Sequence, residues 1–90
     1  MGMLVIHHLV KDFDTWKPAY DRHADKRKAA GLRHDHVLQS VTDPNNVTIV
    51  MDFMDVSRAK AFAASSNLKT VMKAAGVVGA PVIHILKKVT

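Results

Sequence analysis

Four stretches of the chain carry apolar residues in the short runs and alternations that are typical of β-strands. Residues 3–10 (MLVIHHLV) are apolar on both alternating faces, which predicts a central strand that is covered on both sides. Residues 33–41 and 47–54 flank the turn-forming sequence DPNN, and together they predict a β-hairpin. Residues 82–89 (VIHILKKV) predict the last strand, which follows VVGAP as a connection and has Pro81 at its edge.

A longer stretch before the hairpin has the spacing of an amphipathic helix. Asp12 or Asp14 can cap its start, and it runs to about Ala30, where Gly31 suits a left-handed C-terminal residue. Pro18 falls early in this helix, where one lost amide costs least. The predicted buried stripe consists of Phe13, Trp16, Ala19, Tyr20, His23, Ala24, Arg27 and Ala30.

A second helical stretch follows the hairpin. Asp55 caps its start, a break is expected at residues 65–67, and Gly76 ends the segment that follows the break. Its inward positions include Phe62 in the first part and Leu68 in the second. The stretch therefore predicts a small-residue helix in two pieces.

The element order βαββαβ is that of the ferredoxin-like unit, which belongs to the α+β class. It predicts a four-stranded antiparallel sheet with the helices on one face, and at 90 residues the chain, 1–90, is expected to form one domain. The other face of the sheet has no cover of its own. Because the first and last strands are apolar on both faces, this bare face is expected to meet a second copy in a homodimer.

The composition removes several classes of function. The chain has no cysteine and no glutamate, so thiol chemistry and thiolate metal sites are excluded and any carboxylate must come from its aspartates. The net charge of +5 is spread among acidic residues and outward helix positions, so it indicates solvated surface rather than nucleic-acid binding. No run approaches the length of a membrane span, and a cytoplasmic location is expected.

Polar residues interrupt the aromatic stripe of the first helix. Trp16 and Tyr20 can be ordinary core, but His23 and Arg27 on the same face would need partners if they were buried. Two interpretations stay open: Arg27 extends toward solvent and His23 bonds a neighbouring carbonyl, or the face is the wall of a ligand pocket. The pocket interpretation makes Trp16, Tyr20 and Arg27 substrate-binding residues, with Phe62 from the second helix.

The histidines are the other candidates for chemistry, since the chain has six of them. His7 and His8 point to opposite faces of their strand, so at most one of them can face a helix-covered pocket. If residue 7 lies opposite residue 84, then His7 and His84 are cross-strand neighbours that could share a proton. If Thr42 lies opposite Val47, the hairpin places His36, Leu38 and Ser40 beside Phe53, Met51 and Ile49 on one face.

The whole chain resembles members of the dimeric α+β barrel superfamily, in particular small proteins similar to antibiotic biosynthesis monooxygenases. The resemblance is carried by VIHHLVKDFDTWKPAYDRH (5–23), by the hairpin around DPNNVTIVMDF (43–53) and by DVSRAKAFAASSNLKTVMKAAGVVGAP (55–81). It implies a homodimer whose two sheets close into a barrel, with a ligand pocket in each subunit between sheet and helices. Some relatives oxidise polycyclic aromatic compounds without a metal or organic cofactor, and others degrade haem.

The first functional hypothesis is therefore a cofactor-independent monooxygenase, or a related cyclase or isomerase, for an aromatic or polyketide-like substrate. His23, His7 or His84 would be the catalytic base, and Trp16, Tyr20, Arg27, His36 and Phe62 would bind the substrate. No cofactor and no metal is expected for this chemistry. One alternative is a non-catalytic binding module or structural dimer, and another is metal capture through His7, His34, His36 and His84.

Overall fold

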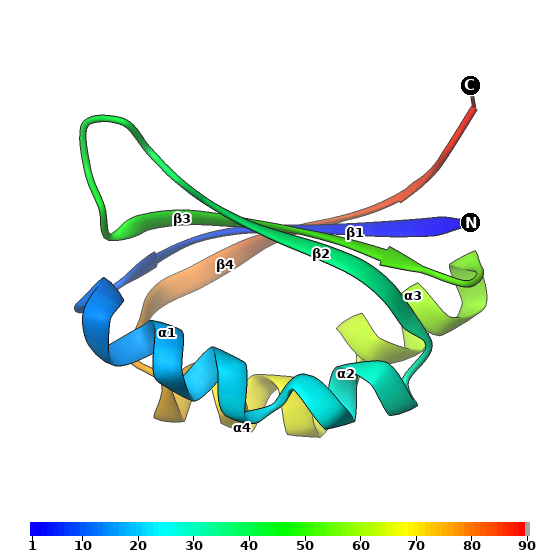
Figure 1. Ribbon diagram of the computed structural model, residues 1–90, viewed down its shortest axis with the longest axis horizontal. Helices are drawn as coiled ribbons and strands as arrows, with labels where there is room; N and C mark the ends of the chain where they lie inside the picture. The colour runs from blue at the N-terminus through cyan, green and yellow to red at the C-terminus, as the bar shows by residue number, and fades with distance from the viewer. Residues whose placement is uncertain (90) are drawn as a thin grey trace.

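The computed structural model describes residues 1–89 as one twisted sheet with helices on one side of it (Figure 1). The elements follow in the order β1 (Gly2–Val10), α1 (Phe13–Arg22), α2 (Ala24–Ala29), β2 (Leu32–Gln39), β3 (Asn46–Phe53), α3 (Val56–Ala63), α4 (Ser66–Ala74) and β4 (Val77–Lys87). The strands form a four-stranded antiparallel sheet in the order β2-β3-β1-β4. The predicted ferredoxin-like α+β fold, with its helices on one face of the sheet, is confirmed.

The core lies between the sheet and the helices. Leu4 and Ile6 of β1 and Met51 and Phe53 of β3 are almost completely buried, because these two strands are the central ones. Alternate residues of β1 and β3 point toward the helices. The burial of these side chains removes apolar surface from water, which stabilises the fold. Phe62 of α3 completes this layer with its ring centre 5.3 Å from that of Phe53.

The first helical stretch differs from its prediction, because it is two helices. α1 ends at Arg22, His23 has a non-helical conformation, and α2 restarts at Ala24. The carbonyl of Tyr20 accepts the amide of His23, three residues on, in a tight turn. In a continuous α-helix it would accept the amide of Ala24, four residues on. The side chain of Arg27 in α2 reaches back to α1, where it contacts the ring and the carbonyl of Tyr20.

The caps of the second helical stretch follow the sequence. The Asp55 side chain accepts a hydrogen bond from the Arg58 amide, as predicted, and Ser65 caps α4 through the Leu68 amide. The predicted break before α4 is therefore an N-cap. Gly76 ends this stretch with a positive φ, as expected from the sequence.

The hairpin register was predicted wrongly. Gln39, and not Thr42, lies opposite Val47, because residues 40–45 form a wide loop. The Ser40 amide donates a hydrogen bond to the Asn46 carbonyl at the base of this loop. The shift is an odd number of residues, so it exchanges the two faces of β2. Asp35 lies opposite Met51 on the helix side, whereas His34, His36 and Leu38 lie opposite Asp52, Val50 and Thr48 on the other side.

The last strand was also predicted too short, and its pairing differs. β4 begins at Val77 and not at residue 82, because VVGAP pairs with the end of β1 across an irregularity between His7 and Leu9. His84 lies opposite Val5, and His7 lies opposite Val82. The assumed pairing of His7 with His84 is therefore wrong, although both side chains share the face of the sheet that the helices leave open.

That open face is apolar mainly along the central strand β1 and the edge strand β4, whereas β3 contributes Asn46, Thr48 and Asp52 to it besides Val50. No helix of residues 1–89 covers it, and Figure 1 shows all helices on the opposite side. Several of its larger side chains are about half exposed, since nothing in the described chain packs on them. Its apolar residues are Met3, Val5, Leu9, Leu38, Val50, Val78, Val82 and Leu86.

Gly31 provides a test of this fold at the junction between α2 and β2. Its φ is +101°, and an added Cβ would lie 2.5 Å from the Arg58 side chain. We expect Gly31→Ala to lower the free energy of unfolding by about 1–3 kcal/mol, because the left-handed backbone disfavours any side chain. Urea denaturation measures this loss. The loss should persist in an Arg58→Ala background, and its disappearance there would assign it to the side-chain contact instead.

Candidate functional site

A cavity of about 40 Å³ lies between the sheet and the helices. The sheet forms its roof, α1 and α2 form one wall, and α3 and α4 form the other. Of its lining residues, Lys26 and Asn67 are exposed, and with the partly exposed His23 and Val71 they mark the mouth of the cavity. The lining residues are Ile6, His8, Trp16, Tyr20, His23, Lys26, Arg27, Ile49, Met51, Phe62, Asn67, Leu68, Val71, Met72 and Ala75.

One wall of the cavity is a stack of four side chains. The His8 ring meets Trp16 edge-on, with ring centres 5.6 Å apart, and Trp16 stacks on Tyr20 at 5.0 Å. The Cζ of Arg27 lies 3.7 Å above the centre of the Tyr20 ring, where a cation is attracted to the π face. The spacing of Trp16 and Tyr20 by one helical turn brings their two rings together. Arg27 joins the stack from α2, with its side chain directed back toward Tyr20.

His8 is a buried imidazole, with 4% of its surface exposed. Its Nδ1 lies 3.2 Å from the carbonyl oxygen of Val47. A carbonyl can only accept, so Nδ1 carries the hydrogen and Nε2 keeps a free lone pair. Burial lowers the pKa of His8 below its usual 6.5, and the hydrogen bonds of its own backbone and of Val47 oppose this only in part. The ring is therefore neutral near pH 7 and can accept a proton at Nε2.

Tyr20 has the opposite character. Its hydroxyl donates a hydrogen bond to the Asp35 carboxylate, which β2 places on the helix side of the sheet. Burial raises the pKa of Tyr20 far above its ordinary value, and the bond to Asp35 raises it further. Tyr20 is thus a fixed hydrogen-bond donor and does not serve as a base.

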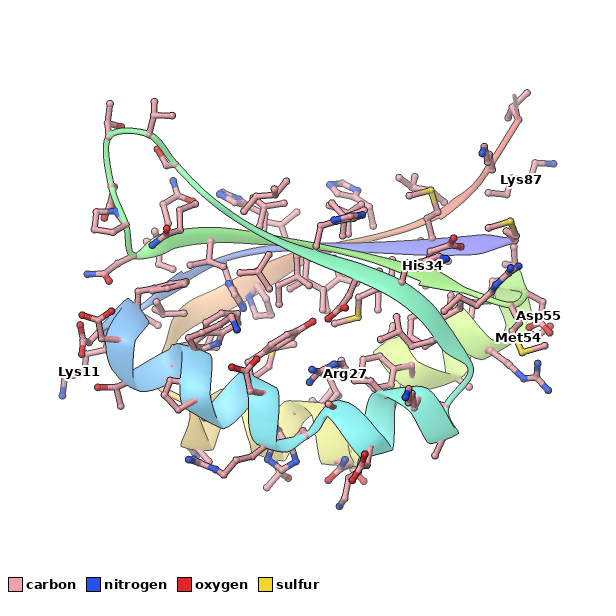
Figure 2. The ribbon with its side chains drawn as sticks, viewed as in Figure 1. Lys11, Arg27, His34, Met54, Asp55 and Lys87 are labelled. Carbon is pink, nitrogen blue, oxygen red and sulfur yellow. The ribbon has the colours of Figure 1, made fainter. Side chains whose placement is uncertain are left out.

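Arg27 is the only charged residue among the buried ones of the described chain, with 6% of its surface exposed. Its Nη1 donates to the Tyr20 carbonyl at 2.6 Å, and this carbonyl also accepts the His23 amide. Its Nε lies 3.9 Å from the Asp35 Oδ2, too far for a hydrogen bond. Figure 2 shows Arg27 between α2 and the sheet.

Five of the residues predicted for the site come together in this cavity. Trp16, Tyr20, His23, Arg27 and Phe62 all line it. The interpretation that Arg27 reaches toward solvent is wrong, since its side chain is buried. His23 lies at the mouth and is partly exposed.

The other three predicted residues lie on the opposite face of the sheet. His7, His36 and His84 project from the open face, away from the cavity. The Nε2 of His7 donates to the Asn46 Oδ1 at 2.6 Å, which ties it to the neighbouring strand. The structure therefore does not bring these histidines together with Trp16 and Tyr20.

Two residues of the site were missed. His8 is the histidine of the pair at 7 and 8 that faces the cavity, which the alternation of β1 alone leaves undecided. Asp35 reaches Tyr20 because of the hairpin register, and its position opposite the buried Met51 could have been found only with the correct register.

Within residues 1–89, no three histidine or aspartate side chains converge closely enough to hold a metal ion. No helix in this part of the chain is long and apolar enough to cross a membrane.

The fold defines a class of structure, the ferredoxin-like α+β unit, and in this chain a small cavity lies under the sheet. Solved structures with this fold cover the chain from end to end. A crystal structure described as an antibiotic biosynthesis monooxygenase superposes with a TM-score of 0.76 at 13% identity and covers 100% of both chains. SnoaB, a cofactor-independent oxygenase from Streptomyces nogalater, superposes with a TM-score of 0.79 at 12% identity over 99% of this chain and 93% of its own.

A conserved protein from Methanosarcina mazei shares the same fold, with a TM-score of 0.74 at 15% identity over 98% of this chain and 93% of its own. No family model matches the sequence, and no curated protein matches it. The predicted resemblance to antibiotic biosynthesis monooxygenases is thereby confirmed at the level of the fold. Identities this low carry the arrangement of the chain and not its chemistry.

The buried state of His8 predicts a pH dependence of stability. As pH falls below 6.5, the unfolded chain takes up a proton at this position before the folded protein does, because the folded pKa is lowered. The contribution of His8 to the free energy of unfolding is therefore fully present above pH 6.5, and it declines as the pH falls below that value. Urea unfolding between about pH 8 and about pH 5.5 should show a smaller decline in His8→Gln than in the unchanged protein. His36→Gln, on the open face, is the control and should keep the full decline.

Proposed function

We propose that the protein is a homodimer that binds a hydroxylated aromatic molecule in the cavity and oxidises it with molecular oxygen, without a cofactor. The observation that carries this proposal is the neutral His8 imidazole, whose free Nε2 belongs to a ring that lines the cavity beside Trp16. The likeness in fold to a cofactor-independent oxygenase supports the same class of reaction. The location in the cytoplasm stays a prediction.

The step that His8 performs is removal of a proton from the substrate. A hydroxyl or an activated ring CH₂ that loses its proton becomes an electron-rich anion, which can transfer an electron to oxygen. When a CH₂ becomes C=O, one oxygen atom stays in the product and the other leaves as water with the two hydrogens. This balance needs no outside reductant, which agrees with the expectation that no cofactor takes part.

The remaining residues of the wall stabilise the anion and orient the ring. Tyr20 stays protonated and is held by Asp35, so the stack of Trp16 and Tyr20 keeps one geometry during the reaction. The positive charge of Arg27 favours the anionic form of the substrate over the neutral one. His7 and His84 take no part in this step, because they project from the other face.

Substrate entry requires the cavity to widen. Its volume of about 40 Å³ is well below that of about 150 Å³ at which a cavity holds benzene. Met51 and Met72 line it with flexible, unbranched side chains that can repack around a ring. A protein that binds such a molecule and returns it unchanged would instead be a binding module, the alternative left by the sequence.

The open face of the sheet supports the proposed homodimer. Its apolar side chains from β1 and β4 would be buried if two copies packed their sheets together, as the fold resemblance implies. The hydrophobic gain would add stability to a chain of this small size.

His8→Gln tests the catalytic step. With a dihydroxyanthrone as substrate, we expect oxygen uptake to fall by about 100-fold or more, since the general base is lost. An oxygen electrode measures the rate. His84→Gln changes a histidine on the other face and should retain full activity. Equal rates in His8→Gln and the unchanged protein would contradict the proposed base, and recovery of unaltered substrate with the unchanged protein would favour the binding module.

Val82→Glu tests the homodimer. Val82 lies on the open face of β4 and is 49% exposed in the single chain. A buried carboxylate at the centre of an apolar interface is costly, so we expect the variant to run as a monomer in sedimentation velocity while the unchanged protein runs as a dimer. Lys69→Glu, on the exposed side of α4, is the control and should stay dimeric. An unchanged protein that is monomeric would contradict the interface.

A further inference from the structure

The guanidinium of Arg27 has donors that the described chain does not use. Of its five N–H groups, the structure pairs Nη1 with the Tyr20 carbonyl, and the buried Nε has no hydrogen-bond partner among residues 1–89. The nearest carboxylate oxygen is the Asp35 Oδ2 at 3.9 Å, and it already accepts the Tyr20 hydroxyl. A buried donor on a charged group without a partner is costly, so the arrangement favours an acceptor that comes from outside the chain.

The charge of the cavity points to the nature of that acceptor. Lys26 and Arg27 are among its lining residues, and none of the described residues that line it is an aspartate. Asp35 compensates Arg27 only from outside this lining, through its position next to Tyr20. The other polar lining residues, such as His8 and Asn67, bring no negative charge. The cavity thus carries an excess of positive charge, which favours an anionic ligand.

The size of the cavity limits how much of the ligand can reach Arg27. A volume of about 40 Å³ accommodates a group of a few atoms, such as a carboxylate, without any movement of the walls. A ring attached to that group would extend toward the mouth, between His23 and Val71. An inorganic anion would contact the positive charge but not the apolar lining of the cavity. An aromatic carboxylic acid would contact both, with its carboxylate on the positive charge and its ring on the apolar side chains.

We infer that the ligand of this cavity is an aromatic carboxylic acid whose carboxylate accepts a hydrogen bond from the Arg27 guanidinium, through an N–H group that the described chain leaves unused. Lys26 at the mouth adds attraction for the same anion. The inference rests on the proposed function and narrows it, because it names the substrates as hydroxylated aromatic acids rather than neutral phenols. The carboxylate provides the anchor, and the ring hydroxyl remains available to His8.

The test compares salicylate with salicylamide, which have the same ring and hydroxyl but differ in the charged group. Binding is followed by the NMR signal of the Trp16 indole N–H, because Trp16 lines the cavity and is the single tryptophan of the chain. We expect salicylate to bind about tenfold or more tightly than salicylamide at neutral pH, since a hydrogen bond to a charged group is worth this much. This comparison needs no variant and so does not depend on the folding of one.

Variants then assign the preference to Arg27. Arg27→Gln should lose the preference for salicylate, while Arg22→Gln, which removes an exposed arginine at the end of α1, should keep it. Equal affinity for acid and amide, no binding of salicylate, or a preference that survives in Arg27→Gln would each overturn the inference.

These outcomes are separate from the fate of the proposed reaction. If salicylate binds through Arg27 but no hydroxylated ring gives oxygen uptake, the anion site is correct and the proposed oxygenase is wrong. If a neutral dihydroxyanthrone gives oxygen uptake but salicylate is not preferred over salicylamide, the oxygenase is correct and the anion site is wrong.

Discussion

The burial of Arg27 beneath the sheet is the constraint on which the site depends. A guanidinium in this position needs acceptors, and one of them is the Tyr20 carbonyl, which also accepts the His23 amide. The cation stacks on the Tyr20 ring, which in turn stacks on Trp16. The cavity wall, its positive charge and the spare Nε therefore all involve this one side chain.

The sheet separates two groups of histidines by the simple alternation of its strands. On the helix side, His8 is buried, neutral and fixed in one tautomer by the Val47 carbonyl. On the open side, His7, His36 and His84 lie among apolar residues that a second copy would cover. Because adjacent residues point to opposite faces, His7 and His8 belong to different environments although they are neighbours in the chain. Chemistry is thus proposed for one face and association for the other.

The fold and half of the site could be predicted from the sequence, and the limits have physical causes. The apolar runs, the cap at Asp55 and the glycine at position 76 fix the elements, and the helical spacing correctly brings Trp16, Tyr20 and Arg27 to one wall. The faces of β2 were reversed because loop geometry, not the DPNN turn alone, sets the hairpin register. That error placed His36 on the wrong side and concealed Asp35. The choice between His7 and His8 also needed the register, since a strand that is apolar on both faces gives no sign of which face the helices cover.

The proposed reaction requires a bare ring nitrogen on His8 at neutral pH, and NMR of the imidazole nitrogens measures this without any substrate. A long-range ¹H–¹⁵N correlation spectrum of the ligand-free protein at neutral pH distinguishes the two neutral tautomers and the charged ring. We expect His8 to carry its hydrogen on Nδ1 and none on Nε2. A hydrogen on Nε2, or a doubly protonated ring, would contradict the proposed reaction, because neither form could accept a proton from a substrate.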